Sequence, residues 1–145
     1  MPLLQPKRWK YLKAFRGRNR GKSIKGNNLA FGEFGVRSNG NGRMTSRQIE
    51  AIRVLIRRRI GDKAKMWTRV FPDLPITKHP LEARMGKGKG AVERYEARIK
   101  RGQILFEVAG VPSKQAKEAL SKVRHKINLP VSVITLKSGE GKPWQ

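Results

Sequence analysis

The sequence lacks cysteine altogether and has few histidines and acidic residues. Without thiols the chain can form neither a disulfide nor a thiolate metal site. Its two histidines, His79 and His125, lie far apart among basic residues, so we expect exposed rings and no metal or catalytic centre. No apolar run approaches the roughly 20 residues that a membrane-spanning helix needs. The start of the chain also lacks the apolar segment of a secretory signal.

The shortage of negative charge is matched by an excess of positive charge. The 145 residues contain 34 Lys and Arg against 10 Asp and Glu, for a formal net charge of +24. Such a chain repels itself when compact, and a polyanionic partner relieves that repulsion. Nucleic acid is the partner that this composition favours, with an anionic membrane as the competing one. Hydrophobic residues make up 37%, enough for the modest core of one domain.

The first 28 residues contain no acid at all, and the first acidic residue is Glu33. Isolated, such a segment should be disordered, because its charges repel and little apolar surface can be buried. It could be a solvated tail. We favour an arm that folds along RNA, with cations on phosphates and the interleaved aromatics on bases. The contacts expected here are Lys7, Arg8, Lys10, Lys13, Arg16, Arg18, Arg20 and Lys22.

The same composition is typical of mitochondrial transit peptides, which are rich in arginine and poor in acids. However, the segment has no serine before Ser23, and it contains Gly17 and Gly21 within the basic tract. We therefore interpret it as part of the mature protein.

One helix is predicted with defined ends. Thr45 and Gln48 form the spacing of a capping box, and the helix should run from about Ser46 to Ile60 and stop at Gly61. Isoleucines at helical spacing form one apolar stripe for the core. On the other side, the arginines could be a solvated face, but with only Glu50 nearby we favour phosphate contact. The arginines assigned to RNA are Arg43, Arg47, Arg57 and Arg58.

The remaining pattern predicts an α+β domain. A second helix should begin with Ser113 as its N-cap and present an inward stripe of Ala116, Leu120, Val123 and Ile127. The ranges that favour strands are 29–38, 64–72, 74–83, 93–102, 103–110 and 131–137, with a turn at 39–42. We therefore expect two helices on mixed or antiparallel strands. The division would be a basic arm (1–28), a core (29–136) with a projecting loop (82–92), and a polar tail (137–145).

A glycine-rich stretch, "RMGKGKG", lies within that loop. A nucleotide-binding P-loop requires Ser or Thr after Gly-Lys, whereas the stretch Gly86 to Gly90 is followed by Ala91, so the hydroxyl is missing. The other candidate, residues 17–23, has a spacer one residue too short. A loop ordered against a large polyanion is therefore the better interpretation. Its residues are Arg84, Met85, Gly86, Lys87, Gly88, Lys89 and Gly90.

Other functional classes find little support. Carboxylates are scattered singly, so we expect no enzyme, and we expect no cofactor. Both predicted helices have aliphatic stripes matched to strands, which argues against a membrane role. Signatures of DNA-binding motifs are absent. Charge spread over an arm, a helix face and a loop suits a protein surrounded by folded RNA.

Several long stretches resemble the large-subunit ribosomal protein L-sixteen family, whose archaeal and eukaryotic counterpart is L-ten-e. They are "LLQPKRWKYLKAFRGRNRG", "GRMTSRQIEA", "WTRVFPDLPITKHPLEARMGKGKGAVE" and "GQILFEVAGVPSKQAKEAL", and the resemblance covers nearly all of residues 3–136.

The resemblance implies a single domain of the α/β-hammerhead type on the large ribosomal subunit, near the aminoacyl site for tRNA. It implies that the arm, Lys7 to Arg20, runs in ribosomal RNA (rRNA) and that the loop, Arg84 to Gly90, projects toward tRNA and the peptidyl-transferase centre. An arginine that is hydroxylated in some bacterial members corresponds to Arg84. The partners implied are large-subunit rRNA, tRNA and neighbouring large-subunit proteins, with no homo-oligomer expected.

Three departures from the family pattern stand out. Residues 93–97 read "ERYEA" where the family usually has "EYWVA", residues 57–65 are unusually basic, and the end of the chain is extended. This drift slightly favours a ribosome of an organelle, the mitochondrion, over a bacterial one. The alternative from another class is a free RNA chaperone or nucleoid-type cationic protein.

Overall fold

The computed structural model describes residues 4–136, and the prediction of a polar tail at 137–145 lies outside them. Within this part the chain forms two α-helices, a short 3-10 helix and seven strands in two antiparallel sheets. The α+β class is confirmed. Every pair of strands between residues 4 and 136 is antiparallel, and the one parallel pairing in this range is an isolated bridge between Lys22 and Arg101.

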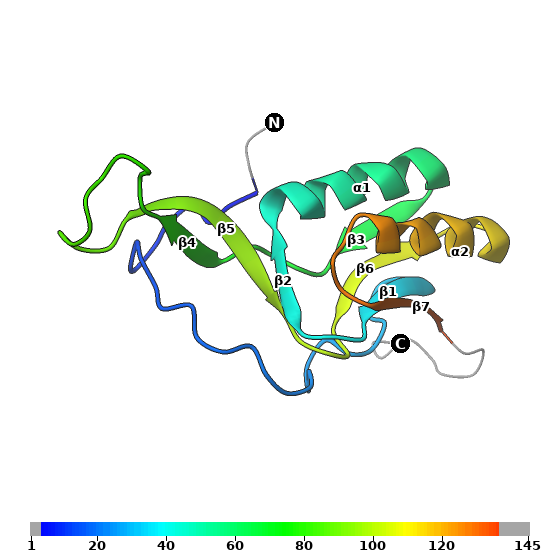
Figure 1. Ribbon diagram of the computed structural model, residues 1–145. Coiled ribbons are helices and arrows are strands. Elements are labelled where there is room, and N and C mark those ends of the chain that lie inside the picture. Colours follow the sequence, from blue (N-terminus) through cyan, green and yellow to red (C-terminus); the bar gives the residue numbers. More distant parts are fainter. Residues whose placement is uncertain (1–3, 137–145) are drawn as a thin grey trace.

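The larger sheet has the strand order β3-β6-β1-β7. The helices α1 (Ser46–Ile60) and α2 (Ser113–Ser121) lie side by side over one face of this part of the molecule (Figure 1). The strands are β1 (Phe34–Ser38), β3 (Lys65–Thr68), β6 (Ile104–Ala109) and β7 (Val131–Thr135).

The smaller sheet has the order β2-β5-β4 and comprises β2 (Gly42–Thr45), β4 (Leu74–Lys78) and β5 (Ala91–Ile99). The hairpin of β4 and β5 extends away from the helices and ends in the glycine-rich loop (Figure 1). Two connections, β1 to β2 and β5 to β6, pass between the sheets side by side. Gly102 N–H donates to the Ser38 carbonyl at 2.7 Å and Ser38 N–H donates to the Gln103 carbonyl at 2.9 Å, so these connections are bonded together.

The first helix, α1 (Ser46–Ile60), has the predicted bounds and capping box. Gln48 N–H donates to Thr45 Oγ1 at 3.2 Å, and Thr45 N–H donates to Gln48 Oε1 at 2.9 Å. At the other end, Gly61 adopts a φ of +77°, a conformation that favours glycine. The predicted stripe is buried: Ile49, Ile52, Ile56 and Ile60.

The second helix differs from its prediction at the start. In α2 (Ser113–Ser121), Pro112 occupies the N-cap with an extended backbone, and Ser113 is already helical. Ser113 as N-cap is therefore wrong, because the N-cap residue must lie outside the helical conformation. A 3-10 helix, η1 (Lys122–His125), follows. The predicted inward residues Ala116, Leu120, Val123 and Ile127 are all buried.

The strand predictions were correct in place but not in length. Residues 42–45 form β2 and pair with β5, a strand that the sequence did not predict: Gly42 was expected in the turn and Thr45 as the N-cap. Residues 29–33 lie outside β1. The N–H groups of Ala30, Phe31 and Gly32 bind a side chain instead of a neighbouring strand, whereas Glu33 N–H donates to β6, at the Val108 carbonyl.

That side chain is Glu107 on β6, which is completely buried. Its Oε2 accepts hydrogen bonds from the N–H groups of Ala30, Phe31 and Gly32, at 3.1, 2.6 and 2.8 Å. Its Oε1 pairs with Arg69, whose guanidinium lies 5.0 Å above the Phe31 ring. A buried carboxylate is tolerated when it is paired and fully hydrogen-bonded, as here. Glu107 thereby fixes where the basic arm enters the core.

Replacing Glu107 with alanine should lower the free energy of unfolding by about 3–5 kcal/mol, the usual cost of removing one partner from a buried ion pair. Three N–H groups would lose their acceptor at the same time. Urea unfolding of the full chain measures this. The control is Glu33→Ala, which removes an exposed carboxylate. Equal stabilities for the two variants would contradict the role of Glu107.

Candidate nucleic-acid interface

The basic arm, residues 4–28, is docked on the domain. It runs beside the smaller sheet in extended conformation and reaches the connections between the sheets (Figure 1). Its cations point outward, and every Lys and Arg between residues 7 and 25 is exposed. An isolated arm is expected to be disordered, but in the folded chain the arm is ordered. Specific contacts hold it in place, rather than a large apolar face.

One contact is aromatic. The ring of Trp9 stacks on Tyr95 of β5, with centroids 5.9 Å apart and planes at 20°. Tyr95 lies in the stretch that departs from the family pattern, and it is buried. Its neighbour Arg94 bonds Glu93 and Glu96, and the hydrogen bond to Glu96 is the main cause that raises the pKa of Arg94. The added charges in this stretch therefore pair with one another.

Other contacts are polar. Asn19 Nδ2 donates to the carbonyls of Gly42 and Ile99, at 2.8 and 2.6 Å, and so joins the arm to β2 and β5 together. Further along, Ser23 N–H donates to the Arg101 carbonyl at 2.8 Å. Sequence reasoning missed Asn19, because nothing in a polar, basic tract distinguishes one asparagine that faces the core.

The glycine loop projects away from the rest of the molecule, and residues 79–89 are all exposed. Gly86, Lys87 and Gly88 have φ values of +94°, +60° and +92°. Lysine rarely adopts a positive φ, and such strain clusters at functional sites. Two large apolar side chains, Leu81 and Met85, are 96% and 99% exposed. The loop therefore offers its charges and these two apolar groups to a partner.

The arm and the loop contact each other. Lys13 Nζ donates to the Lys89 carbonyl, and Lys89 Nζ donates to the Ala14 carbonyl, both at 2.6 Å. The Lys89 ammonium also lies 5.3 Å from the centroid of the Phe15 ring, a cation–π geometry. Lys87 makes no such contact within the described chain. The two lysines, predicted to act alike, are thus separated: Lys89 joins the arm to the loop, and Lys87 stays available.

The arginines of α1 also differ from one another. Arg57 donates to the carbonyls of Ala64 and Asp62, at 2.7 and 3.3 Å, and so closes the turn after the helix. Arg53 pairs with Glu50, and this hydrogen bond lowers the pKa of Glu50 and raises that of Arg53. Arg47 and Arg58 are exposed and make no ion pair among the described residues. These two are the better placed of the predicted set to meet phosphate.

Arg43 on β2 lies beside the arm, with Nη2 at 3.4 Å from the carbonyls of Arg16 and Gly17.

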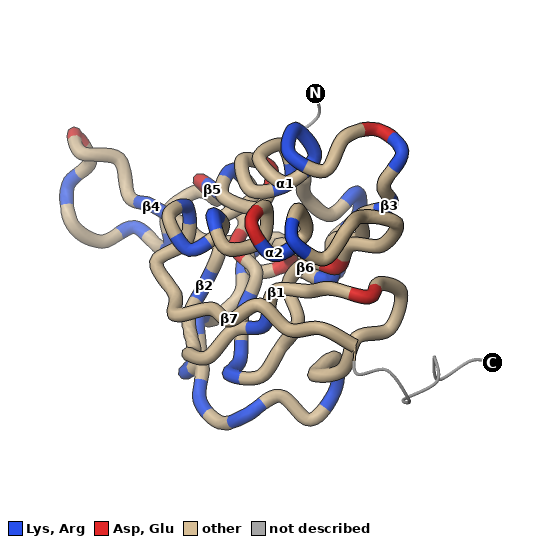
Figure 2. Tube along the Cα trace, turned by 90° about the vertical axis from the view of Figure 1, so that its right-hand side faces the viewer, with Lys and Arg blue, Asp and Glu red and all other residues tan. Residues whose placement is uncertain are grey.

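Positive segments cover the arm, the loop and both helices, whereas negative segments are few (Figure 2). Between residues 4 and 136, no cluster of three or more His, Asp or Glu could hold a metal ion. The helices within this range are too short or too polar to cross a membrane. The surface therefore carries the positive charge that a polyanion would bind.

Comparison with known proteins matches residues 6–134 to the family described as ribosomal protein L16p/L10e. Three relatives carry the name large ribosomal subunit protein uL16. That of Sulfurihydrogenibium is 51% identical over 140 residues, covering 97% of this chain and all of the relative. Those of Sulfurovum and Psychromonas ingrahamii are each 50% identical over 135 residues, covering 93% of this chain and 96% and 98% of the relatives.

These relatives come from bacteria. The slight preference for a mitochondrial ribosome is therefore not supported. The departures from the family pattern had suggested that preference. Despite them, the chain is about 50% identical to bacterial proteins over nearly its full length.

Replacing Trp9 with alanine should release the start of the arm. An aromatic pair is worth about 0.5–1.5 kcal/mol beyond burial, so we expect cleavage by trypsin between residues 7 and 22 to be about two- to tenfold faster. Mass spectrometry of the fragments measures it. Tyr11→Ala is the control, because Tyr11 is 73% exposed in the same segment. Identical cleavage rates in the two variants would show that the stack does not hold the arm.

Proposed function

This chain belongs to the ribosomal protein L16p/L10e family, and on that premise we propose that it is a structural constituent of the large ribosomal subunit that binds rRNA and contacts tRNA. The proposal is supported by one observation: the sequence is about 50% identical, over almost the whole length, to proteins named as constituents of that subunit. Its role would be to stabilise the folded rRNA, not to catalyse a reaction.

Binding of rRNA is supported by the excess of cations over partners. The arm presents its exposed lysines and arginines in an extended row, and extended basic segments follow a phosphate backbone. Docking on the smaller sheet lowers the entropy that the arm would otherwise lose on binding RNA. The arm, Arg47 and Arg58 would form the rRNA-facing surface, together with neighbouring large-subunit proteins around it.

Contact with tRNA is the role proposed for the loop at the end of the β4–β5 hairpin. The loop is exposed throughout, and the Lys87 ammonium has no partner among the described residues. Its glycines let the backbone pass close to a larger molecule. Arg84 and Lys87 would meet phosphates, and Met85 would lie against a base or sugar. A loop tied at Lys89 to an rRNA-bound arm would hold that position.

The full chain should bind RNA with a steep salt dependence, since each neutralised phosphate adds about 0.7–0.9 to the log–log slope. The chain should also stay with large subunits during sedimentation in high salt. A free RNA chaperone would wash off in the same gradient. A salt slope near zero would contradict the electrostatic basis of the proposal, and loss from subunits would favour the chaperone.

Lys87→Ala and Lys89→Ala should have different effects in reconstituted large subunits. Lys87→Ala removes a proposed phosphate contact and should weaken tRNA binding at the aminoacyl site about three- to tenfold, with normal assembly. Lys89→Ala should weaken it too, and should also speed tryptic cleavage of the arm, which Lys87→Ala leaves unchanged.

Lys114→Ala is the matched control for both variants, because it removes an exposed lysine on α2. Equal losses of assembly and tRNA binding in Lys87→Ala would mean that the loop is only an rRNA anchor.

A further inference from the structure

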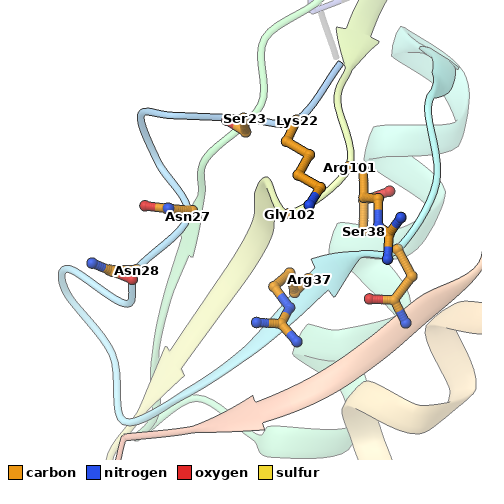
Figure 3. Close-up of a pocket in the computed structure, with 9 residues that line it drawn as sticks. Lys22, Ser23, Asn27, Asn28, Arg37, Ser38, Arg101 and Gly102 are labelled. Carbon is orange, nitrogen blue, oxygen red and sulfur yellow. The ribbon is translucent and has the colours of Figure 1, made fainter. Parts of the chain in front are cut away.

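A polar cavity lies where three segments of the chain meet. The end of the arm, the turn between β1 and β2, and the turn between β5 and β6 border an open hollow of about 340 Å³, and we name this the junction cavity (Figure 3). Lys22 enters from the arm, Arg37 from β1 and Arg101 from the turn after β5. Of these three residues, only Lys22 belongs to the RNA contacts expected from the sequence.

The charge of the cavity has no counterpart inside the protein. Among the described residues, none of those that line it is acidic. The side chains of Lys22, Arg37 and Arg101 form no ion pair in this part of the chain, whereas six carboxylates elsewhere are paired. Three unpaired cations around one hollow repel each other, and an anion placed among them would relieve that repulsion.

The walls are held by backbone bonds, so the cavity is already formed without a ligand. Lys22 and Arg101 form the isolated parallel bridge, and Ile104 N–H donates to the Gly26 carbonyl at 2.9 Å. Arg101 N–H donates to Asn41 Oδ1 at 2.6 Å. These bonds use main-chain groups and the Asn41 side chain, and they leave the cationic groups free. A preformed site loses little conformational entropy on binding.

An irregularity in the sheet lies at the same place. The pairing of β1 with β6 shifts register between Val36 and Arg37. Such irregularities change the direction of a side chain and are frequent beside functional sites. Arg37 is exposed and lines the cavity, although its strand lies in the middle of the larger sheet.

The cavity also carries amides. Asn27 and Asn28 lie at its outer edge, where their amides point away from Lys22 and Arg37 in the view of Figure 3, and neither side chain makes a hydrogen bond within the described chain. Each amide offers donors and an acceptor, which suits the edge of a base or a ribose hydroxyl. The volume of about 340 Å³ lies at the lower end of the roughly 300–1,000 Å³ of small-ligand sites, which suits one nucleotide.

We propose that the junction cavity binds a single unpaired nucleotide of rRNA. Its phosphate would lie among Lys22, Arg37 and Arg101, and its base edge or ribose would bond Asn27 and Asn28. Unpaired nucleotides are the part of RNA that proteins read most often, because their base edges are accessible. This inference rests on the proposed rRNA binding and adds a defined site to it.

The test compares binding of the full chain to two RNA probes, a hairpin with a single-stranded loop and a fully paired duplex of equal length. The charge variant is Arg37→Gln with Arg101→Gln, and its control, Lys114→Gln with Lys117→Gln on α2, removes the same charge elsewhere. We expect the charge variant to bind the hairpin about tenfold more weakly, with a salt slope lower by at least about 0.7–0.9, the contribution of one phosphate. The control should lose less than about threefold. Equal losses would overturn the site.

An amide variant, Asn27→Ala with Asn28→Ala, tests the nucleotide without changing charge. Loss of one or two hydrogen bonds should weaken hairpin binding about three- to tenfold and leave the salt slope and duplex binding unchanged. An equal loss on the duplex, or none on the hairpin, would overturn the assignment. Absence of salt-dependent binding by the unmodified chain would instead overturn the proposed function itself.

Discussion

The scarcity of carboxylates is the constraint on which the rest of this structure depends. With 10 acids for 34 cations, the protein cannot neutralise itself. Among the described residues, Glu107 is the one fully buried acid, and it joins the arm to the core. Several cations instead donate to backbone carbonyls. A carbonyl accepts a hydrogen bond without cancelling the charge. Cations therefore join the arm, the loop and the end of α1 to the domain while the molecule stays strongly positive, a state that a polyanion would stabilise.

The arm acts as a structural element as much as a binding segment. It stacks through Trp9, bonds two strands of the smaller sheet through Asn19, and ends beside both connections between the sheets. Its middle contacts Lys89 at the base of the projecting loop. Rigid support of this kind places binding groups more precisely than a free loop does. In the proposed function, one continuous element would thus connect the rRNA-facing surface, the junction cavity and the tRNA-facing loop.

Prediction from sequence succeeded where the signal was local. The helix α1 was found with its cap and its buried isoleucines, since capping and periodicity are written in neighbouring residues. It failed at Ser113, where Pro112 takes the N-cap, and at residues 30–32, where Glu107 binds the backbone from 75 or more residues away. Arg57 looked like its neighbours on the helix face, and only the turn that packs against it separates their roles.

By itself the sequence determined the family, the class of the fold, the excess of charge and therefore the class of partner, because composition and long matching stretches do not depend on geometry. Only the tertiary structure decided which cations are available. It separated Lys87 from Lys89, gathered Lys22, Arg37 and Arg101 around one cavity, and docked an arm whose composition alone predicts disorder. The physical reason is that a cation's availability depends on what lies within a few ångströms of it, and that neighbourhood is built by residues distant in sequence.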